Sequence, residues 1–385
     1  MKPRWLSAAA YVGMFVFGLV MALLGAVLPL VSERIGFDLA RAGGLFLAMN
    51  AAMLVTMLAL GPLMDRFGKK PPMAAGPVMV AAAVAVLARA AAYDALVAAV
   101  VLLGFGGGLL NGATNTLIAD LHEDPRRKSA ALNLLGIFFG LGAIFLPFTI
   151  GSLVARLGLA PILYAAAGVA AAPALLASVL RFPAPRRRQR VPGREIRRLA
   201  RNPVVLAFAF LLFFESGNEF ILAGYASLFL TRETGMTVAS ASLVLAGFWG
   251  SVIVARVLVS RVLLHVSAPA VVLAGAAVAA GGVVLLITAG SAAQAVAALL
   301  ITAFGASGIF PTTLGQAGAR FPEYSGTVFG ILFAVALAGG MSLPWAVGRM
   351  AAWAGFRAAF WLPVAGFAAI ACLQVLAGRK RSSAE

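Results

Sequence analysis

The sequence predicts an all-α integral membrane protein, with 12 transmembrane helices in two pseudo-symmetric six-helix bundles. Hydrophobic residues make up 62% of the 385 residues and charged residues only 11%, and the mean hydropathy is +1.00. Apolar runs of about 20 residues, each long enough to cross roughly 30 Å of hydrocarbon as a helix, recur along the whole chain. Spacings of Gly and Pro repeat between the two halves. Segments of alternating polarity, which a membrane β-barrel requires, are absent from the sequence.

The first half contains six apolar runs, which we expect to span the membrane at about residues 7–30, 43–64, 73–93, 95–120, 129–154 and 160–181. The run that follows Trp5 is too long for a cleavable signal peptide, so we interpret it as a retained helix. The third and fourth spans are divided only by a short gap near Tyr93. Residues 1–181 therefore form the predicted N-terminal bundle.

A basic linker at residues 182–202 follows, with Pro183, Pro185 and a run of three arginines. Its later part, residues 195–201, is expected to form a short basic helix at the membrane surface, since anionic lipid attracts Arg. Six more spans follow at about 203–230, 239–262, 268–289, 293–318, 325–348 and 356–378. Residues 203–385 therefore form the predicted C-terminal bundle.

An internal repeat relates the fifth span to the eleventh. One constant spacing aligns Pro125 with Pro322, Gly142 with Gly339, Leu146-Pro147 with Leu343-Pro344, and Gly151 with Gly348. Chance agreement is common for Gly and Leu, but prolines in register across both a loop and a helix favour duplication. Two related bundles with a central binding site are typical of secondary transporters.

The positive charges indicate the orientation. Most of the 30 Lys and Arg fall in segments on the side of the N-terminus, so both termini and the linker are predicted to be cytoplasmic in a multi-pass protein of the cell inner membrane. This distribution also explains the net charge of +17 without a nucleic-acid partner. Cys372 is the only cysteine, so no disulfide can form within the chain.

The turn between the second and third spans holds an ordered set of glycines and charges. We expect Gly61 to let a helix end approach a neighbour closely and Gly68 to adopt a positive φ. The charged residues mark the exit from lipid and are Asp65, Arg66, Lys69 and Lys70. The set is either an ordinary membrane-exit loop or part of a cytoplasmic gate.

Two carboxyls near the middle of the seventh span are candidates for proton coupling. Glu215 and Glu219 are four residues apart and so share one helix face. An ionised side chain in hydrocarbon costs several kcal/mol, so this face should line an internal cavity. Burial and mutual repulsion favour a proton on at least one carboxyl. The alternative is a fixed ion pair with Arg256 of the eighth span.

Other polar or aromatic residues at depth are candidates for substrate binding, together with Glu219. Amides can hydrogen-bond a polyhydroxylated ligand, or they can bond between helices. Tryptophans can stack on a ligand ring or pack between helices. The candidates are Asn50, Asn111, Asn115, Trp249, Gln316 and Trp345.

The sequence contains no motif for phosphate binding or metal binding. The glycines around Gly106 have no preceding strand and no following Gly-Lys-Ser/Thr, so they indicate close helix packing rather than phosphate binding. We therefore expect neither an ATP-driven pump nor an enzyme, and no cofactor. The two histidines, His122 and His265, have no ligand cluster around them, so no metal site is expected.

The segment from Gly61 to Lys70 closely resembles the loop motif of the major facilitator superfamily, and the layout of twelve spans in two halves is similar along nearly the whole chain. Within that superfamily the chain is most similar to the fucose/galactose/glucose:proton symporter group. The residues behind this finer resemblance are 110–116, 138–143, Glu219 with Gly224-Tyr225, and 309–311.

The resemblance implies alternating access about one central site. It also implies a cytoplasmic charge cluster in which Asp65 and Arg66 join Asp120. The repeat places the equivalent loop of the second half around Arg256 to Arg261, which keeps cations but lacks the Asp and the second Gly, so we expect the gate to be strongest on the Asp65 side. Some symporters of this group carry a carboxylate where this chain has Asn111, and another in the first helix, which has no acid here. A proton symporter would therefore have to use the Glu215 and Glu219 pair; otherwise the protein is a facilitator or is coupled differently.

Three functions follow as hypotheses. The first is proton-coupled import of a small polar solute such as a sugar or sugar derivative, by a monomer in the lipid bilayer. The second is export of a drug or metabolite by proton exchange, although Leu146 stands where exporters often have Gly before Pro147. The third is a receptor or scaffold without transport, against which the lack of a soluble domain argues.

Overall fold

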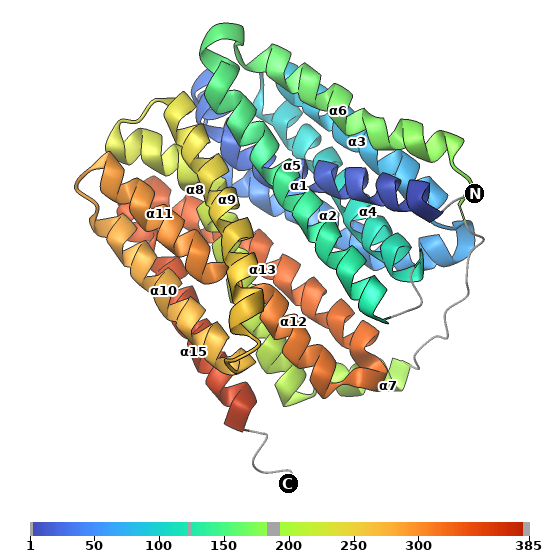
Figure 1. The fold of residues 1–385 in the computed structure, drawn as a ribbon. Coiled ribbons are helices and arrows are strands. Elements are labelled where there is room, and N and C mark those ends of the chain that lie inside the picture. The colour runs from blue at the N-terminus through green and yellow to red at the C-terminus, as the bar shows by residue number, and fades with distance from the viewer. Residues whose placement is uncertain (1–2, 122–124, 183–192, 380–385) are drawn as a thin grey trace. The chain divides into compact units, whose positions relative to one another are not determined.

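The structure is a computed structural model that describes residues 3–121, 125–182 and 193–379 (Figure 1). In these ranges every long element is a helix, and twelve candidate spans are long and apolar enough to cross a membrane, which confirms the predicted count. The first six spans are α1 (Pro3–Ile35), α2 (Leu39–Phe67), α3 (Lys70–Arg89), α4 (Tyr93–Leu121), α5 (Pro125–Leu157) and α6 (Leu159–Val179).

The second set begins after the short helix α7 (Gly193–Ala200), which lies where the basic helix of the linker was expected. The remaining elements are α8 (Pro203–Thr234), α9 (Val238–Val262), α10 (Ala268–Thr288), α11 (Ala292–Ala306), α12 (Ile309–Arg320), a 3-10 turn (Pro322–Tyr324), α13 (Ser325–Ala354), α14 (Phe356–Ala359) and α15 (Trp361–Arg379).

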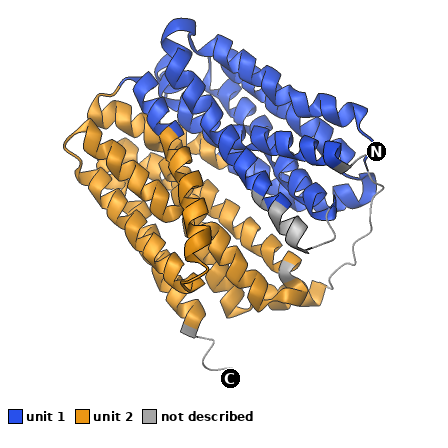
Figure 2. Cartoon of the chain, viewed as in Figure 1, with its two compact units in different colours: residues 1–37, 48–188, 237–246 blue, residues 38–47, 189–236, 247–385 orange. Residues whose placement is uncertain are grey.

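The chain forms two compact units (Figure 2). Unit 1 comprises Met1–Phe37, Ala48–Arg188 and Thr237–Ala246, and unit 2 comprises Asp38–Leu47, Gln189–Met236 and Gly247–Glu385. The units follow the two halves of the chain except at two segments. The start of α2 clusters with unit 2, and the start of α9 clusters with unit 1.

Glycines set the closest helix crossings in unit 1. A Cβ built on Gly142 of α5 would lie 1.8 Å from the carbonyl oxygen of Phe15 in α1, so only glycine permits this crossing. In α4 a Cβ on Gly106 would lie 2.7 Å from the carbonyl oxygen of Gly76 in α3. The glycines of α4 therefore serve helix packing, as predicted.

Unit 2 repeats these crossings with equivalent residues. A Cβ on Gly339 of α13 would lie 1.9 Å from the carbonyl oxygen of Phe213 in α8, and one on Gly305 of α11 would lie 2.8 Å from that of Gly275 in α10. Gly339 is the residue that the sequence repeat aligns with Gly142. The aligned glycines thus make the same kind of backbone contact in each unit, which supports duplication of the six-helix bundle.

The tenth span is broken, although the sequence analysis treated it as one helix. Helix α11 ends at Ala306 and α12 begins at Ile309, with a turn at Ser307 and Gly308 between them. Pro311 explains the break: it has no backbone N–H, so in a continuous helix the carbonyl of Ser307 would have no donor. Pro311 does not disrupt the first turn of α12, where no intrahelical donor is needed.

Candidate functional site

The two glutamates of α8 lie in the interior of unit 2. Glu215 is 3% exposed, and its Oε2 has no hydrogen-bond partner among the described residues. Glu219, one turn further along α8, is partly exposed. A buried carboxyl oxygen without a donor is costly to keep ionised, so this helix turn can hold a proton without disturbing a hydrogen-bond network.

Arg256 lies beside this pair. Arg256 lies inside α9, more than one turn before the helix ends at Val262, which confirms its assignment to the eighth span and not to the loop that follows. Its charge acts electrostatically on both Glu215 and Glu219. Within the described ranges, however, it forms no ion pair with either carboxylate. Its Nε instead donates to the carbonyl oxygen of Ser307 at 3.4 Å.

The same region contains buried polar atoms that the sequence analysis did not select. Asn218 is 1% exposed; its Nδ2 donates to the carbonyl oxygen of Pro363 at 3.2 Å, but its Oδ1 has no partner in the described part of the chain. The hydroxyls of Thr312 and Thr313 in α12 are likewise buried and without a described partner. Their position directly after Pro311 was the sequence signal that could have found them.

The candidate amides of unit 1 lie in α2 and α4. Asn115 and Asn111 share a face of α4: Asn115 Nδ2 donates to the backbone oxygen of Asn111 at 2.8 Å and to its Oδ1 at 3.0 Å. Both side chains are partly exposed, whereas Asn50 of α2 is fully buried. The mutual contact orients the α4 amides and leaves part of their polar surface open.

The candidate binding residues of unit 2 differ in their exposure and in the partners that they already have. Gln316 of α12 exchanges two hydrogen bonds with Gln374 of α15, at 3.3 and 3.0 Å, so its amide is occupied within the protein. Trp249 is 1% exposed and packs edge-to-face with Phe248. Trp345 is 38% exposed and has the guanidinium of Arg349 5.3 Å from its ring centre.

The structure therefore divides the candidate binding residues between the units. Asn50, Asn111 and Asn115 belong to unit 1, and the other candidates, Glu219, Trp249, Gln316 and Trp345, belong to unit 2. In unit 2, Glu219 lies one helix turn from Glu215, and the charge of Arg256 acts on both carboxyls.

The predicted gate residues of unit 1 centre on one ion pair. Lys69 at the start of α3 forms a very short ion pair with Asp120 at the end of α4, and both side chains are largely buried. Lys70 donates to the carbonyl oxygen of Ser178 in α6 at 3.0 Å. These two contacts hold the turn between α2 and α3 against the C-terminal ends of α4 and α6.

The other residues of this turn are placed differently. Gly68 has φ +77°, which confirms the predicted positive φ. The interpretation of Gly61 was wrong: a Cβ there would meet no described atom within 4 Å, because Gly61 lies on an exposed surface. Asp65 and Arg66 are also exposed, and Arg66 lies 5.0 Å from the ring centre of Phe67.

Residues 10–220, more than half of the chain, match the family model of the Major Facilitator Superfamily. The chain belongs to the Major Facilitator Superfamily. Its family and fold therefore indicate a transporter rather than an enzyme. The family model describes the superfamily as a whole, so the finer resemblance to the fucose/galactose/glucose group stays a prediction. No group of three His, Cys, Asp or Glu side chains that could hold a metal occurs in the described ranges.

Solved structures of this superfamily share the fold. A bacterial homologue of the human lysosomal transporter Spinster, in an inward-facing and occupied conformation, has a TM-score of 0.79 and 16% identity, with 98% of each chain covered. A point mutant of the nucleoside transporter NupG has a TM-score of 0.79 and 14% identity, covering 97% of this chain and 99% of that one. A D-xylose–proton symporter has a TM-score of 0.79 and 16% identity, covering 98% and 96%. No match was found among curated protein sequences.

Proposed function

We propose that the protein imports a small polar solute, a sugar or sugar derivative, by proton-coupled symport with alternating access. The observation that carries this proposal is the Glu215 and Glu219 pair: two carboxyls in the middle of a membrane-spanning helix, one of them fully buried with an oxygen that accepts no hydrogen bond from the described residues. Ionising both carboxyls at this depth is costly, so binding and release of a proton changes the energy of the site strongly.

Coupling requires that one carboxyl communicate with both the substrate and water. Glu219 suits this role better than Glu215, because Glu219 is partly exposed whereas Glu215 is enclosed. We assign proton exchange to Glu219. We assign to Glu215 the role of adjusting the protonation of Glu219 through its own charge. The one acid of α1, Glu33, is exposed near the C-terminal end of that helix, so α1 has no acid at depth that could replace them.

Amides are the second support for a polar, hydroxyl-bearing substrate. Asn111 and Asn115 present donors and acceptors from one face of α4, and they are partly exposed. Gln316 is a weaker candidate because its amide is already paired with Gln374. Among the structures with the same fold, one is a D-xylose–proton symporter, and it supports the sugar class only by analogy of fold.

For the setting of this transport we propose a monomer in the cell inner membrane, with both termini and the linker cytoplasmic. The arginines of α7 are exposed, as a helix at an anionic membrane surface requires. Lys69 and Asp120 would then lie on the cytoplasmic side as part of the gate.

The test is uptake into proteoliposomes of radiolabelled D-xylose, L-fucose and D-galactose, each with and without an imposed inward proton gradient. Uridine and a cationic dye serve as probes from other substrate classes. We expect gradient-driven accumulation of at least one sugar, and we expect Glu219→Gln to abolish accumulation while leaving exchange of labelled for unlabelled sugar intact. Glu233→Gln, at the end of the same helix, is the matched control and should accumulate sugar normally.

Two outcomes would contradict the proposal. Unchanged gradient-driven accumulation by Glu219→Gln would remove this residue from coupling. Accumulation of the dye, driven only by a proton gradient of the opposite direction, would favour an exporter that works by proton exchange.

A further inference from the structure

The break in the tenth span leaves a backbone carbonyl that needs a donor. In a continuous helix the carbonyl of Ser307 would accept from the residue four positions later, but that residue is Pro311, which has no N–H. The donor that the structure supplies is the side chain of Arg256 in α9, through Nε at 3.4 Å. A side chain from another helix thus completes the backbone hydrogen bonding at the break.

Helix α9 is packed along this break. Ser251 Oγ donates to the carbonyl oxygen of Leu300 in α11 at 3.1 Å, and a Cβ on Gly308 would lie 3.0 Å from the side chain of Val259. Arg256 therefore projects from a helix that contacts both α11 and the turn, and its side chain is half-buried.

A second set of acceptors is close by. Arg256 acts electrostatically on Glu215 and Glu219, and Glu215 Oε2 has no described partner. Among the helices that pack against α8, α12 ends with Arg320, α13 carries Arg349 beside Trp345, and α15 ends with Arg379. The short helix α7 also packs against α8 and carries Arg194, Glu195, Arg197 and Arg198. Arg357 of α14 pairs with Glu233 at the far end of α8. The two carboxyls and Arg256 are therefore the charged groups that act on one another in this part of unit 2.

We propose that Arg256 is a positioning residue that transmits the protonation state of the carboxyl pair to the break between α11 and α12. When the pair is protonated, Arg256 donates to Ser307 and fixes the turn. When the pair is ionised, the guanidinium moves to a carboxylate, because a charge-assisted hydrogen bond is stronger than a long bond to a neutral carbonyl. The Ser307 carbonyl is then released and α12 can pivot against α11.

This inference rests on the proposed proton handling by the same pair, but its test needs neither substrate nor flux. Amide hydrogen exchange of the full chain in lipid nanodiscs is measured between about pH 5 and pH 9, with correction for the intrinsic pH dependence of exchange. In the wild type we expect protection of the peptide covering residues 303–316 to fall about tenfold as the pair ionises, since one hydrogen bond at the break is lost.

The variants separate the proposed switch from other effects of pH. The double variant Glu215→Gln/Glu219→Gln should keep high protection at every pH, and Arg256→Gln should show low protection at every pH. Arg349→Gln removes an arginine of the same unit whose guanidinium lies over the Trp345 ring, and it should behave as the wild type. Pro311→Ala restores a backbone donor for Ser307, so combining it with Arg256→Gln should recover protection.

Protection in the wild type that does not change with pH would overturn the inference, as would an unchanged pH dependence in Arg256→Gln. Proton-driven uptake that depends on Glu219 without any pH effect at the break would leave the proposed function standing and reject only the switch. A pH effect at the break without proton-driven uptake would reject the function and leave the switch.

Discussion

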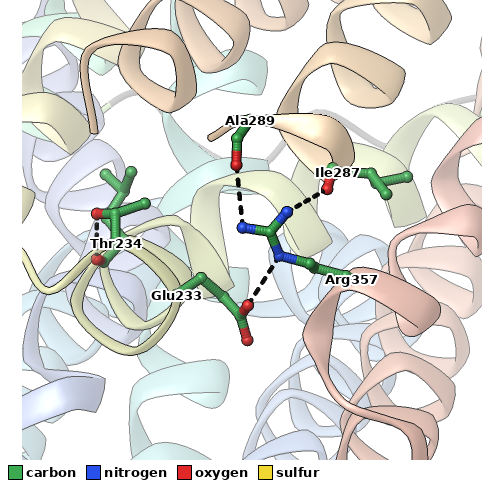
Figure 3. Close-up of polar contacts among 6 residues, drawn as sticks. Glu233, Thr234, Ile287, Ala289 and Arg357 are labelled. Atoms are coloured by element: carbon green, nitrogen blue, oxygen red, sulfur yellow. Dashed lines mark hydrogen bonds and ion pairs between the residues drawn. The ribbon is translucent and has the colours of Figure 1, made fainter. Parts of the chain in front are cut away.

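Arg357 and Glu233 are joined at one end of unit 2, with Arg357 Nε 3.1 Å from Glu233 Oε2 (Figure 3). The two terminal nitrogens of the same guanidinium donate to the carbonyl oxygens of Ile287 at 2.8 Å and Ala289 at 3.0 Å. Arg357 therefore satisfies carbonyls at the C-terminus of α10 while it holds the end of α8.

We predict that Arg357→Ala lowers thermal stability more than Glu233→Ala does. Arg357→Ala removes two donors from helix-end carbonyls and should cost about 1–2 kcal/mol. Glu233→Ala removes only the ion pair, which solvent weakens because the Arg357 side chain is 44% exposed. Thermal denaturation of the purified protein measures both, and Arg156→Ala, an exposed arginine at the end of α5, is the control. An equal loss in the two variants would show that the ion pair, not the carbonyl contacts, dominates.

The close crossing at Gly142 predicts that two glycines of α5 respond very differently to replacement by alanine. Gly142→Ala should prevent correct packing of α1 against α5, because the new Cβ would overlap the Phe15 carbonyl. Gly136→Ala in the same helix meets no described atom within 4 Å and should be neutral or stabilising by about 1 kcal/mol, since Ala favours the helix. The yield of folded protein and its melting temperature test this. Normal folding of Gly142→Ala would contradict the crossing.

The hydrogen bonds between Gln316 and Gln374 predict that replacing both residues costs less stability than replacing Gln316 alone. Gln374 is 2% exposed, so Gln316→Leu would leave its amide buried without partners, at a cost of about 1–3 kcal/mol. The double variant Gln316→Leu/Gln374→Leu should regain most of that stability. Melting temperatures of both single variants and the double variant complete the cycle. Additive losses would show that the two amides do not depend on each other.

The ion pair between Lys69 and Asp120 predicts that the stability effects of mutating these two residues are coupled. Asp120→Asn should destabilise the protein by about 1–3 kcal/mol, because it leaves the largely buried Lys69 ammonium without its counter-charge. The double variant Lys69→Met/Asp120→Asn should recover part of the loss in thermal denaturation. Lys70→Met provides the control, since Lys70 is exposed and donates only to the Ser178 carbonyl. No recovery in the double variant would contradict direct coupling.

Much of the fold was predictable because it depends on properties of neighbouring residues along the sequence. The count of spans follows from apolar run length, and the matched glycines Gly142 and Gly339 follow from a repeat along the chain. The turn at Gly68 is equally local, because a positive φ favours glycine. The close approach expected at Gly61 depends on a neighbouring helix, and there the prediction was wrong.

The site was predicted in part. The helical spacing of Glu215 and Glu219 was enough to place them on one face of α8, and the same holds for Asn111 and Asn115 in α4. The partner of Gln316 was not predictable, because Gln374 belongs to another helix and nothing in either local sequence identifies the other.

The sequence by itself determined the twelve spans, the repeat and the presence of two carboxyls at depth, since each follows from residues that are neighbours along one helix. Only the tertiary structure decided that Arg256 donates to Ser307, that Arg357 meets Glu233, and that the tenth span is divided at the turn before Pro311. The reason is physical: hydrocarbon thickness constrains each helix separately, whereas a polar side chain in the membrane takes whichever acceptor the packing of distant helices brings within reach.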